Sequence, residues 1–84
     1  MATVLNIEGF TVRIWSKDHL PCHVHIFKGN GECVINLKGV NGNPELRESY
    51  RMKRQEVARA IRIVEESQDY LISKWIEIHG GQCQ

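Results

Sequence analysis

The stretch DHLPCHVHIF, residues 18–27, organises the chain. Pro21 fixes the backbone dihedral φ and removes an amide donor, so the first half of the stretch is typical of a turn. The second half alternates polar and apolar residues and contains β-branched and aromatic side chains, which predicts a strand. Because successive side chains of a strand point to opposite faces, His23 and His25 share one face. We therefore predict a turn carrying His19, followed by a strand that displays two more imidazoles.

Three strands account for most of the first half of the chain. The segments 10–15, 23–28 and 32–38 alternate apolar and polar residues, as half-buried strands do. The Gly-Asn-Gly sequence at 29–31 is typical of a tight hairpin between the last two. Residues 1–6 could begin a further short strand, which we do not count in the predicted sheet.

The C-terminal part of the chain predicts one long helix over about 52–79. Apolar or neutral residues recur there every three or four positions, which is the spacing of one helix face, and two glycines at 80–81 end the pattern. The polar run at 65–69 is the weakest part, so a kink or two abutting helices is the alternative at that point. The predicted buried face consists of Val57, Ile61, Val64, Gln68, Leu71, Trp75 and Ile78.

These elements predict a single α+β domain over residues 1–84, a three-stranded antiparallel sheet covered on one face by the long helix. The covered face must be the apolar one, formed by Phe10, Val12, Ile14, Val24, Ile26, Ile35 and Leu37. The open face would carry Arg13, Trp15, His23, His25, Val34 and Asn36. A tryptophan and a valine make this face more apolar than a bare solvent face. We therefore expect it to bind a protein partner or a second copy of the chain, with Arg13, Trp15, His19, His23 and His25 as the binding residues.

The charge of the chain argues against a strong electrostatic attraction to nucleic acid. The 84 residues include 11 basic and 10 acidic side chains, a formal net charge of +1. Basic residues are concentrated only near the predicted start of the helix, at Arg47, Arg51, Lys53 and Arg54. Contact with nucleic acid through these four is the secondary expectation, although a charged helix flank is usually just solvated.

Cysteine usage and hydropathy bound the cellular context. Cys22, Cys33 and Cys83 are odd in number and lack CxxC spacing, so we expect them to be reduced. No apolar run approaches the length of a membrane span, and the first residues do not have the pattern of a secretory signal. These features favour a cytoplasmic protein that does not enter a membrane.

A metal site is the alternative interpretation of the histidines. His19, His23 and His25 could bind zinc or nickel, with Cys22 or Asp18 as a fourth ligand, because neutral imidazole is a good ligand for both ions. In the simpler interpretation, His19 and His23 bond backbone groups of the turn, and His25 is a surface residue. We favour the simpler interpretation and expect no cofactor.

The order of these features resembles domain-of-unknown-function family 4160, a family of small bacterial domains. The resemblance is carried by VRIW at 12–15, DHLPCHVH at 18–25 and LISKW at 71–75. The turn of the family usually reads Asp/Glu-His-x-Pro-Pro-His-Phe-His, and Cys22 and Val24 depart from it. The family also tends to carry a tryptophan in the first half of its helix, which this chain lacks. The residues that match the pattern of the turn are His19, Pro21, His23 and His25.

The resemblance implies a small βββα domain, often encoded beside another small protein in arrangements that resemble toxin–antitoxin modules. It implies no established reaction. We therefore expect a non-enzymatic protein-binding module, one member of a toxin–antitoxin-like or phage-defence-related pair in a bacterium or phage.

A small nuclease is the alternative function. A histidine on a strand of a small sheet–helix domain is similar to the way ribonuclease toxins of the HicA type present a catalytic histidine ahead of a hairpin. His23 or His25 would act as general acid or base near neutral pH, while Arg13, Lys17 or Lys28 would hold phosphate. Against this, the spacing fixes no second acid–base group.

Overall fold

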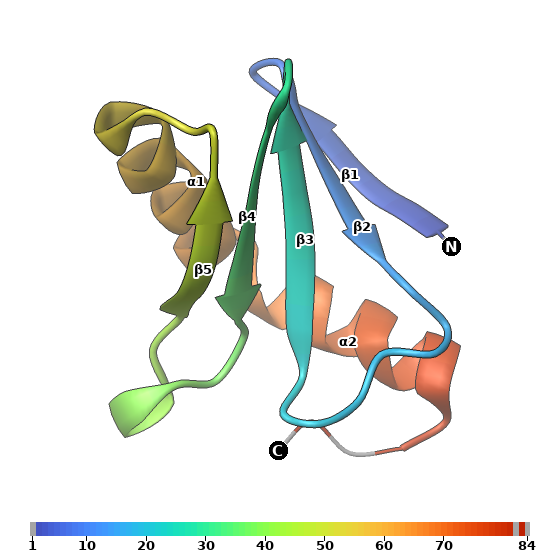
Figure 1. Ribbon diagram of the computed structural model, residues 1–84. Coiled ribbons are helices and arrows are strands. Elements are labelled where there is room, and N and C mark those ends of the chain that lie inside the picture. Colours follow the sequence, from blue (N-terminus) through green and yellow to red (C-terminus); the bar gives the residue numbers. More distant parts are fainter. Residues whose placement is uncertain (1, 82, 84) are drawn as a thin grey trace.

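Five antiparallel strands form one sheet, in which every strand pairs with its neighbour in the sequence, in the order β1-β2-β3-β4-β5. A computed structural model describes residues 2–81 and 83, and it stacks two α-helices on one face of this sheet (Figure 1). The strands are β1 (Ala2–Ile7), β2 (Phe10–Ile14), β3 (His23–Lys28), β4 (Gly31–Asn36) and β5 (Glu45–Tyr50). The helices are α1 (Arg54–Glu66) and α2 (Gln68–His79), and a short 3-10 turn, η1 (Val40–Gly42), precedes β5. The predicted α+β class with an antiparallel sheet is confirmed.

The predicted count of three strands is wrong, because β1 and β5 form the two edges of the sheet. In β5, all six residues of the sequence ELRESY are exposed. Charged, exposed residues are typical of an edge strand, where they discourage pairing with other chains. They also remove the apolar alternation by which a strand is recognised in the sequence.

The predicted single helix is two helices. The backbone of Ser67 leaves the helical region, with φ −114° and ψ 15°, and separates α1 from α2. This break lies inside the polar run at 65–69, where a kink was the predicted alternative. The first helix begins at Arg54 rather than near residue 52, and within residues 2–81 no helix is both long and apolar enough to cross a membrane.

The core lies between the sheet and the helices, on the face predicted from the alternation. Phe10, Val12, Ile14, Val24, Ile26, Ile35 and Leu37 are all buried there. The helices contribute Ala60, Ile63, Val64, Leu71 and Trp75. The prediction that Ile61 is deeply buried is wrong: it is only partly buried, because Ala60, Ile63 and Val64, spaced by three and four residues, form the inner face of α1. Val57, Gln68 and Ile78, also predicted on the inner face, are partly buried as well.

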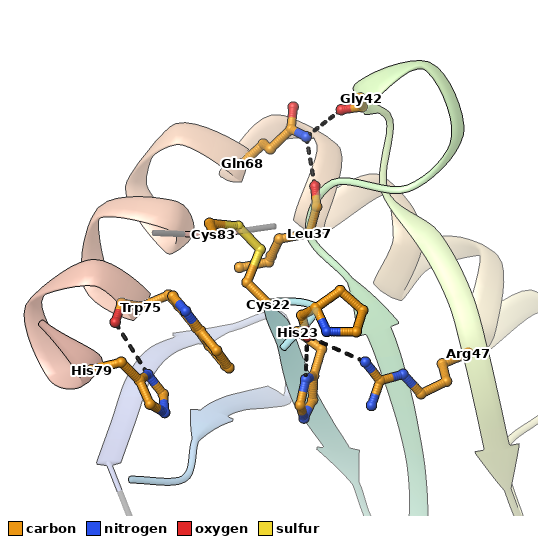
Figure 2. Close-up of a disulfide and its surroundings, with 10 residues drawn as sticks. Cys22, His23, Leu37, Gly42, Arg47, Gln68, Trp75, His79 and Cys83 are labelled. Atoms are coloured by element: carbon orange, nitrogen blue, oxygen red, sulfur yellow. Dashed lines mark hydrogen bonds between the residues drawn. A yellow bond between two sulfur atoms is a disulfide. The ribbon is translucent and has the colours of Figure 1, made fainter. Parts of the chain in front are cut away.

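A disulfide joins Cys22, just before β3, to Cys83, beyond the end of α2 (Figure 2). Their Cα atoms are 5.0 Å apart, and the expectation that these two cysteines are reduced is therefore wrong. Cys22 occupies the core side of the chain next to Val24, as strand alternation requires. The third cysteine, Cys33, is a buried free thiol, as expected of a core residue.

Candidate metal centre

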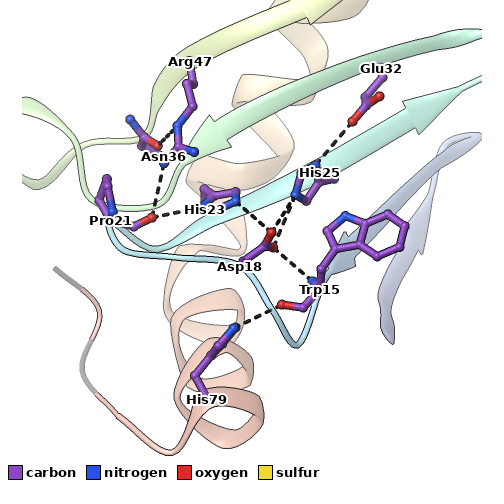
Figure 3. Close-up of polar contacts among 9 residues, drawn as sticks. All are labelled: Trp15, Asp18, Pro21, His23, His25, Glu32, Asn36, Arg47 and His79. Carbon is purple, nitrogen blue, oxygen red and sulfur yellow. Dashed lines mark hydrogen bonds and ion pairs between the residues drawn. The ribbon is translucent and has the colours of Figure 1, made fainter. Parts of the chain in front are cut away.

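A tight turn between β2 and β3 places the carboxylate of Asp18. The backbone N–H of Asp18 donates to the carbonyl oxygen of Trp15 at 3.1 Å. In the opposite direction, the backbone N–H of Trp15 donates to Oδ2 of Asp18, also at 3.1 Å. These two bonds hold the Asp18 side chain over the start of β3 rather than letting it extend into solvent (Figure 3).

Two histidine rings meet this carboxylate from β3. Nε2 of His23 lies 3.4 Å from Oδ1 of Asp18, and Nε2 of His25 lies 3.3 Å from the same carboxylate. The two rings stand edge to face, with their centroids 5.1 Å apart. The predicted sharing of one sheet face by His23 and His25 is confirmed, and Asp18 is the group that joins them.

The other nitrogen of each ring is oriented by an acceptor. Nδ1 of His23 lies 2.9 Å from the carbonyl oxygen of Pro21, and Nδ1 of His25 lies 3.3 Å from Oε2 of Glu32 (Figure 3). For His23, the contact of Nδ1 with Pro21 is the shorter one, so we assign its ring hydrogen to Nδ1. In a neutral ring of this tautomer, Nε2 carries a bare lone pair. The lone pair of His23 therefore faces Oδ1 of Asp18, which is an acceptor itself. His25 lies between two carboxylates at equal distance, and the contacts do not select one of its nitrogens for the hydrogen.

Burial keeps His23 in this neutral form. The residue is 4% exposed, and its desolvation lowers the pKa of His23 below the usual range. The hydrogen bond to Pro21 and the charge of Asp18 act in the opposite direction, whereas the positive charge of Arg47 adds to the lowering. His23 therefore offers a lone pair, not a proton, to the group in front of it at neutral pH.

The spacing of these atoms fits a tetrahedral metal ion. One donor atom from each of Asp18, His23 and His25 lies within 4.8 Å of the others. Ligands bound to zinc at about 2.0–2.1 Å in a tetrahedron are separated by about 3.3–3.4 Å. The two contacts of the carboxylate with the imidazoles already have this length. Only the separation between the two imidazoles has to adjust.

A hollow of about 430 Å³ opens beside this cluster. We call it the histidine hollow; it is lined by Lys17, Asp18, His19, Leu20, Pro21, His23, His25 and Arg47. Arg47 comes from the edge strand β5, whereas the other lining residues belong to the turn and to β3. The donor atoms of the cluster are therefore accessible from one side, where a metal could keep a water or a ligand.

Comparison with known families identifies the chain. The model of a domain of unknown function, DUF4160, matches residues 9–76 of the 84-residue sequence. The chain belongs to this family. No curated protein and no solved structure matches it.

The matched part of this DUF4160 domain contains the whole cluster and the histidine hollow, since both lie between residues 17 and 47. It ends inside α2, before Cys83. The resemblance stated from the turn motif is thereby confirmed, and the family itself is described by no reaction or ligand.

The structure changes the set of metal ligands proposed from sequence. Asp18, weighed as one of two choices for a fourth ligand, is the central acceptor of the cluster. His19 is exposed at the rim of the hollow and lies outside the cluster, and Cys22 is unsuitable because it is bonded to Cys83 on the core side. The histidine pair His23 and His25 is retained.

The open face is less apolar than expected. Val34, predicted to be exposed there, is 3% exposed. Trp15 is partly buried, with its ring edge-on to His25 at a centroid distance of 5.6 Å. Arg13 lies over the ring of Phe27 at 5.4 Å and pairs with His25 in the sheet register. Contact of these residues with a partner stays a prediction.

The basic residues predicted to bind phosphate or nucleic acid lie in separate parts of the domain. Of the three proposed phosphate ligands, only Lys17 lines the histidine hollow. Lys28 lies at the far end of β3 and packs over the ring of Phe10, with Nζ 4.7 Å from its centroid. Among the four basic residues weighed for nucleic acid, Arg47 alone lines the hollow; Arg51, Lys53 and Arg54 follow the other end of β5.

Two residues of the site were missed by sequence reasoning, Glu32 as a partner of His25 and Arg47 as a partner of the turn. Glu32 lies two residues from the register partner of His25. The correct register of the hairpin between β3 and β4 therefore indicates that Glu32 is close to His25. Arg47 stands on a strand that was not predicted, and no local pattern connects it to the histidines.

Proposed function

We propose that this domain binds a divalent transition-metal ion through Asp18, His23 and His25, with zinc as the best match. The observation that supports the proposal is the convergence of one carboxylate and two imidazole Nε2 atoms, with the two imidazole-to-carboxylate contacts at 3.3–3.4 Å. Two imidazole nitrogens and one carboxylate form a common catalytic zinc set, which leaves a fourth position for water or a ligand. Nickel accepts the same donors and is the second choice.

A proton does not satisfy this cluster as well as a metal. A proton on Nε2 of His25 would satisfy the contact between His25 and Asp18. The lone pair of His23 would still face the same carboxylate, because burial disfavours a proton on that ring. A dication between the three residues satisfies every donor at once.

The bonds at Nδ1 are those that orient metal ligands. Metal-bound histidines usually donate their second ring hydrogen to a backbone carbonyl or a carboxylate, which fixes the tautomer and the ring. His23 uses the first kind of acceptor, in Pro21, and His25 uses the second, in Glu32. Both imidazoles therefore have the second-nitrogen acceptors that would orient them toward a metal ion.

Metal titration of one His25 variant and one Asp18 variant tests the proposal. The wild-type chain should bind Zn²⁺ with one-to-one stoichiometry in competition with a chromophoric chelator, and His25→Ala should abolish this. Asp18→Asn should also abolish it while preserving the fold, because the amide can accept from Trp15 and donate to an imidazole. His19→Ala is the matched control, since His19 is in the same turn but outside the cluster, and its affinity should be unchanged. A wild-type chain that binds neither Zn²⁺ nor Ni²⁺ would show that the cluster is structural.

A protein partner is the second proposal, and the edge strand β5 supports it. Leu46 and Tyr50 on this strand are 39% and 56% exposed, so their side chains offer apolar surface to a partner. The partner would be the other member of a toxin–antitoxin-like or phage-defence pair. Capture of the protein encoded by the adjacent gene tests this, with Trp15→Glu and Leu46→Lys separating the open face from the strand edge. A chain that stays monomeric and captures nothing from that neighbour would contradict it.

A further inference from the structure

Arg47 is held in place beside the metal cluster by two acceptors. Its Nε donates to Oδ1 of Asn36 at 2.9 Å, and one terminal nitrogen donates to the carbonyl oxygen of Pro21 at 3.3 Å. The same carbonyl oxygen accepts the Nδ1 hydrogen of His23 (Figure 3). The guanidinium group and the imidazole are thus positioned by one shared atom.

This positioning leaves the guanidinium group with donors to spare. An arginine side chain has five N–H donors in a planar fork, and the bonds to Asn36 and Pro21 occupy two of them. Arg47 is an exposed residue that lines the histidine hollow, so the remaining donors can reach a ligand there. Such a fork matches the oxygens of a carboxylate or a phosphoryl group, and the fixed geometry lowers the entropic cost of binding.

The charge of the histidine hollow favours a multiply charged anion. Lys17 and Arg47 line it as cations, while Asp18 is its one acidic lining residue. When a dication is bound, the single negative charge of Asp18 is consumed as a metal ligand, and His23 and His25 contribute none. The hollow then carries an excess of positive charge next to an open coordination position. A tetrahedral oxyanion can neutralise the charge and fill that position with one of its oxygens.

We propose that the histidine hollow binds the phosphoryl group of a phosphate ester, with one oxygen on the metal ion and another on Arg47. This inference rests on the proposed metal centre. His19, exposed at the rim, is placed to face the rest of the ester. A phosphoryl group is favoured over a carboxylate because its third oxygen can meet Lys17 while the first two are engaged.

Cobalt-substituted protein provides the test, because the visible absorption of Co²⁺ reports the ligands of the ion directly. Inorganic phosphate added to the Co²⁺-loaded chain should change this spectrum and saturate. Adenosine 5′-monophosphate, whose terminal phosphoryl group has three free oxygens, should do the same, whereas a ribodinucleotide, whose internal diester has only two, should bind more weakly. A normal Co²⁺ spectrum that none of the three ligands alters would overturn this inference and leave the metal centre standing. Failure to bind Co²⁺ would overturn both.

Arg47→Gln measures the contribution of the guanidinium group. It should weaken phosphate binding by about tenfold or more, as expected for a lost charge-assisted bond. The Co²⁺ spectrum of the phosphate-free variant should match the wild type, which verifies that the fold and the metal site persist. Arg54→Gln is the matched control, since Arg54 is an exposed arginine outside the hollow, and it should bind phosphate normally. Equal phosphate affinity of Arg47→Gln and wild type would contradict the role of Arg47.

Discussion

The carboxylate of Asp18 accepts a hydrogen bond from the backbone N–H of Trp15, three residues earlier, at 3.1 Å. Because the backbone N–H of Asp18 also donates to the carbonyl oxygen of Trp15, the turn is closed from both sides. Oδ2 of Asp18 thus contacts both the backbone and His25, while Oδ1 faces His23 and His25. The residue that centres the cluster is thus also the residue that shapes the turn.

This double role predicts opposite effects of two substitutions on the metal-free protein. Asp18→Ala should lower the free energy of unfolding by about 1–3 kcal/mol, because the N–H of Trp15 loses its acceptor. Asp18→Asn should keep the wild-type stability or exceed it, since its amide replaces one acceptor facing the imidazoles with a donor. Urea denaturation in the presence of a chelator measures both. Equal destabilisation of the two variants would contradict this prediction. It would show that the charge of the Asp18 carboxylate stabilises the metal-free fold by pairing with a protonated histidine.

The disulfide should stabilise the fold substantially. Cys22 and Cys83 are separated by 61 residues, and closing so long a loop in the unfolded chain contributes about 2–4 kcal/mol. Cys83→Ser should therefore lower the free energy of unfolding by that amount in urea denaturation. A reductant should reduce the stability of the wild type to that of the variant and have no further effect on the variant. Equal stability of wild type and variant without reductant would show that the bond does not form in solution.

Cys33 should be inert to alkylation in the folded protein. Burial raises the pKa of the Cys33 thiol to about 12, so the reactive thiolate is absent at pH 8. Mass spectrometry after iodoacetamide treatment at pH 8 should find Cys33 unmodified in the native state and modified in urea. The variant Cys83→Ser allows a comparison of two buried thiols in one chain. It frees Cys22, which is fully buried like Cys33. Rapid labelling of Cys33 in the native chain would show that the core opens readily.

Two isoleucines on α1 should differ in their contribution to the core. Ile63 is 1% exposed within the core, whereas Ile61 is partly buried at its margin. Ile63→Ala should cost about 2–5 kcal/mol, the range of a fully buried aliphatic side chain, and Ile61→Ala clearly less. Thermal and urea denaturation of the matched pair measures the difference. A larger loss for Ile61→Ala would mean that α1 packs through its other face.

The alternation of side chains was sufficient to predict the central strands. Segments 10–15 and 23–28 have one buried face and one open face, so their period of two is visible in the sequence. This alternation is missing from β5, because both faces of that strand are exposed and neither requires apolar residues. The break at Ser67 could be predicted only as an alternative, because the polar run that weakens a helix does not by itself end one.

The candidate site was predictable only in its local part. His23 and His25 fall on one face by strand parity alone. The position of Asp18 depends on how the turn at 15–18 closes, which its sequence does not determine. Arg47 reaches the turn through pairing of β4 with β5, a relationship that requires the whole sheet.

The simple up-and-down order of the sheet has a consequence for how the domain acquires its shape. Because each strand pairs with the one before it, the sheet can grow hairpin by hairpin through contacts between nearby residues, and such local topologies fold fast. The cluster draws on residues from the β2–β3 turn to the start of β4, so its donors can gather while α1 and α2 are still uncoiled. A nascent chain emerging from the ribosome would then expose the proposed metal ligands before it buries a core.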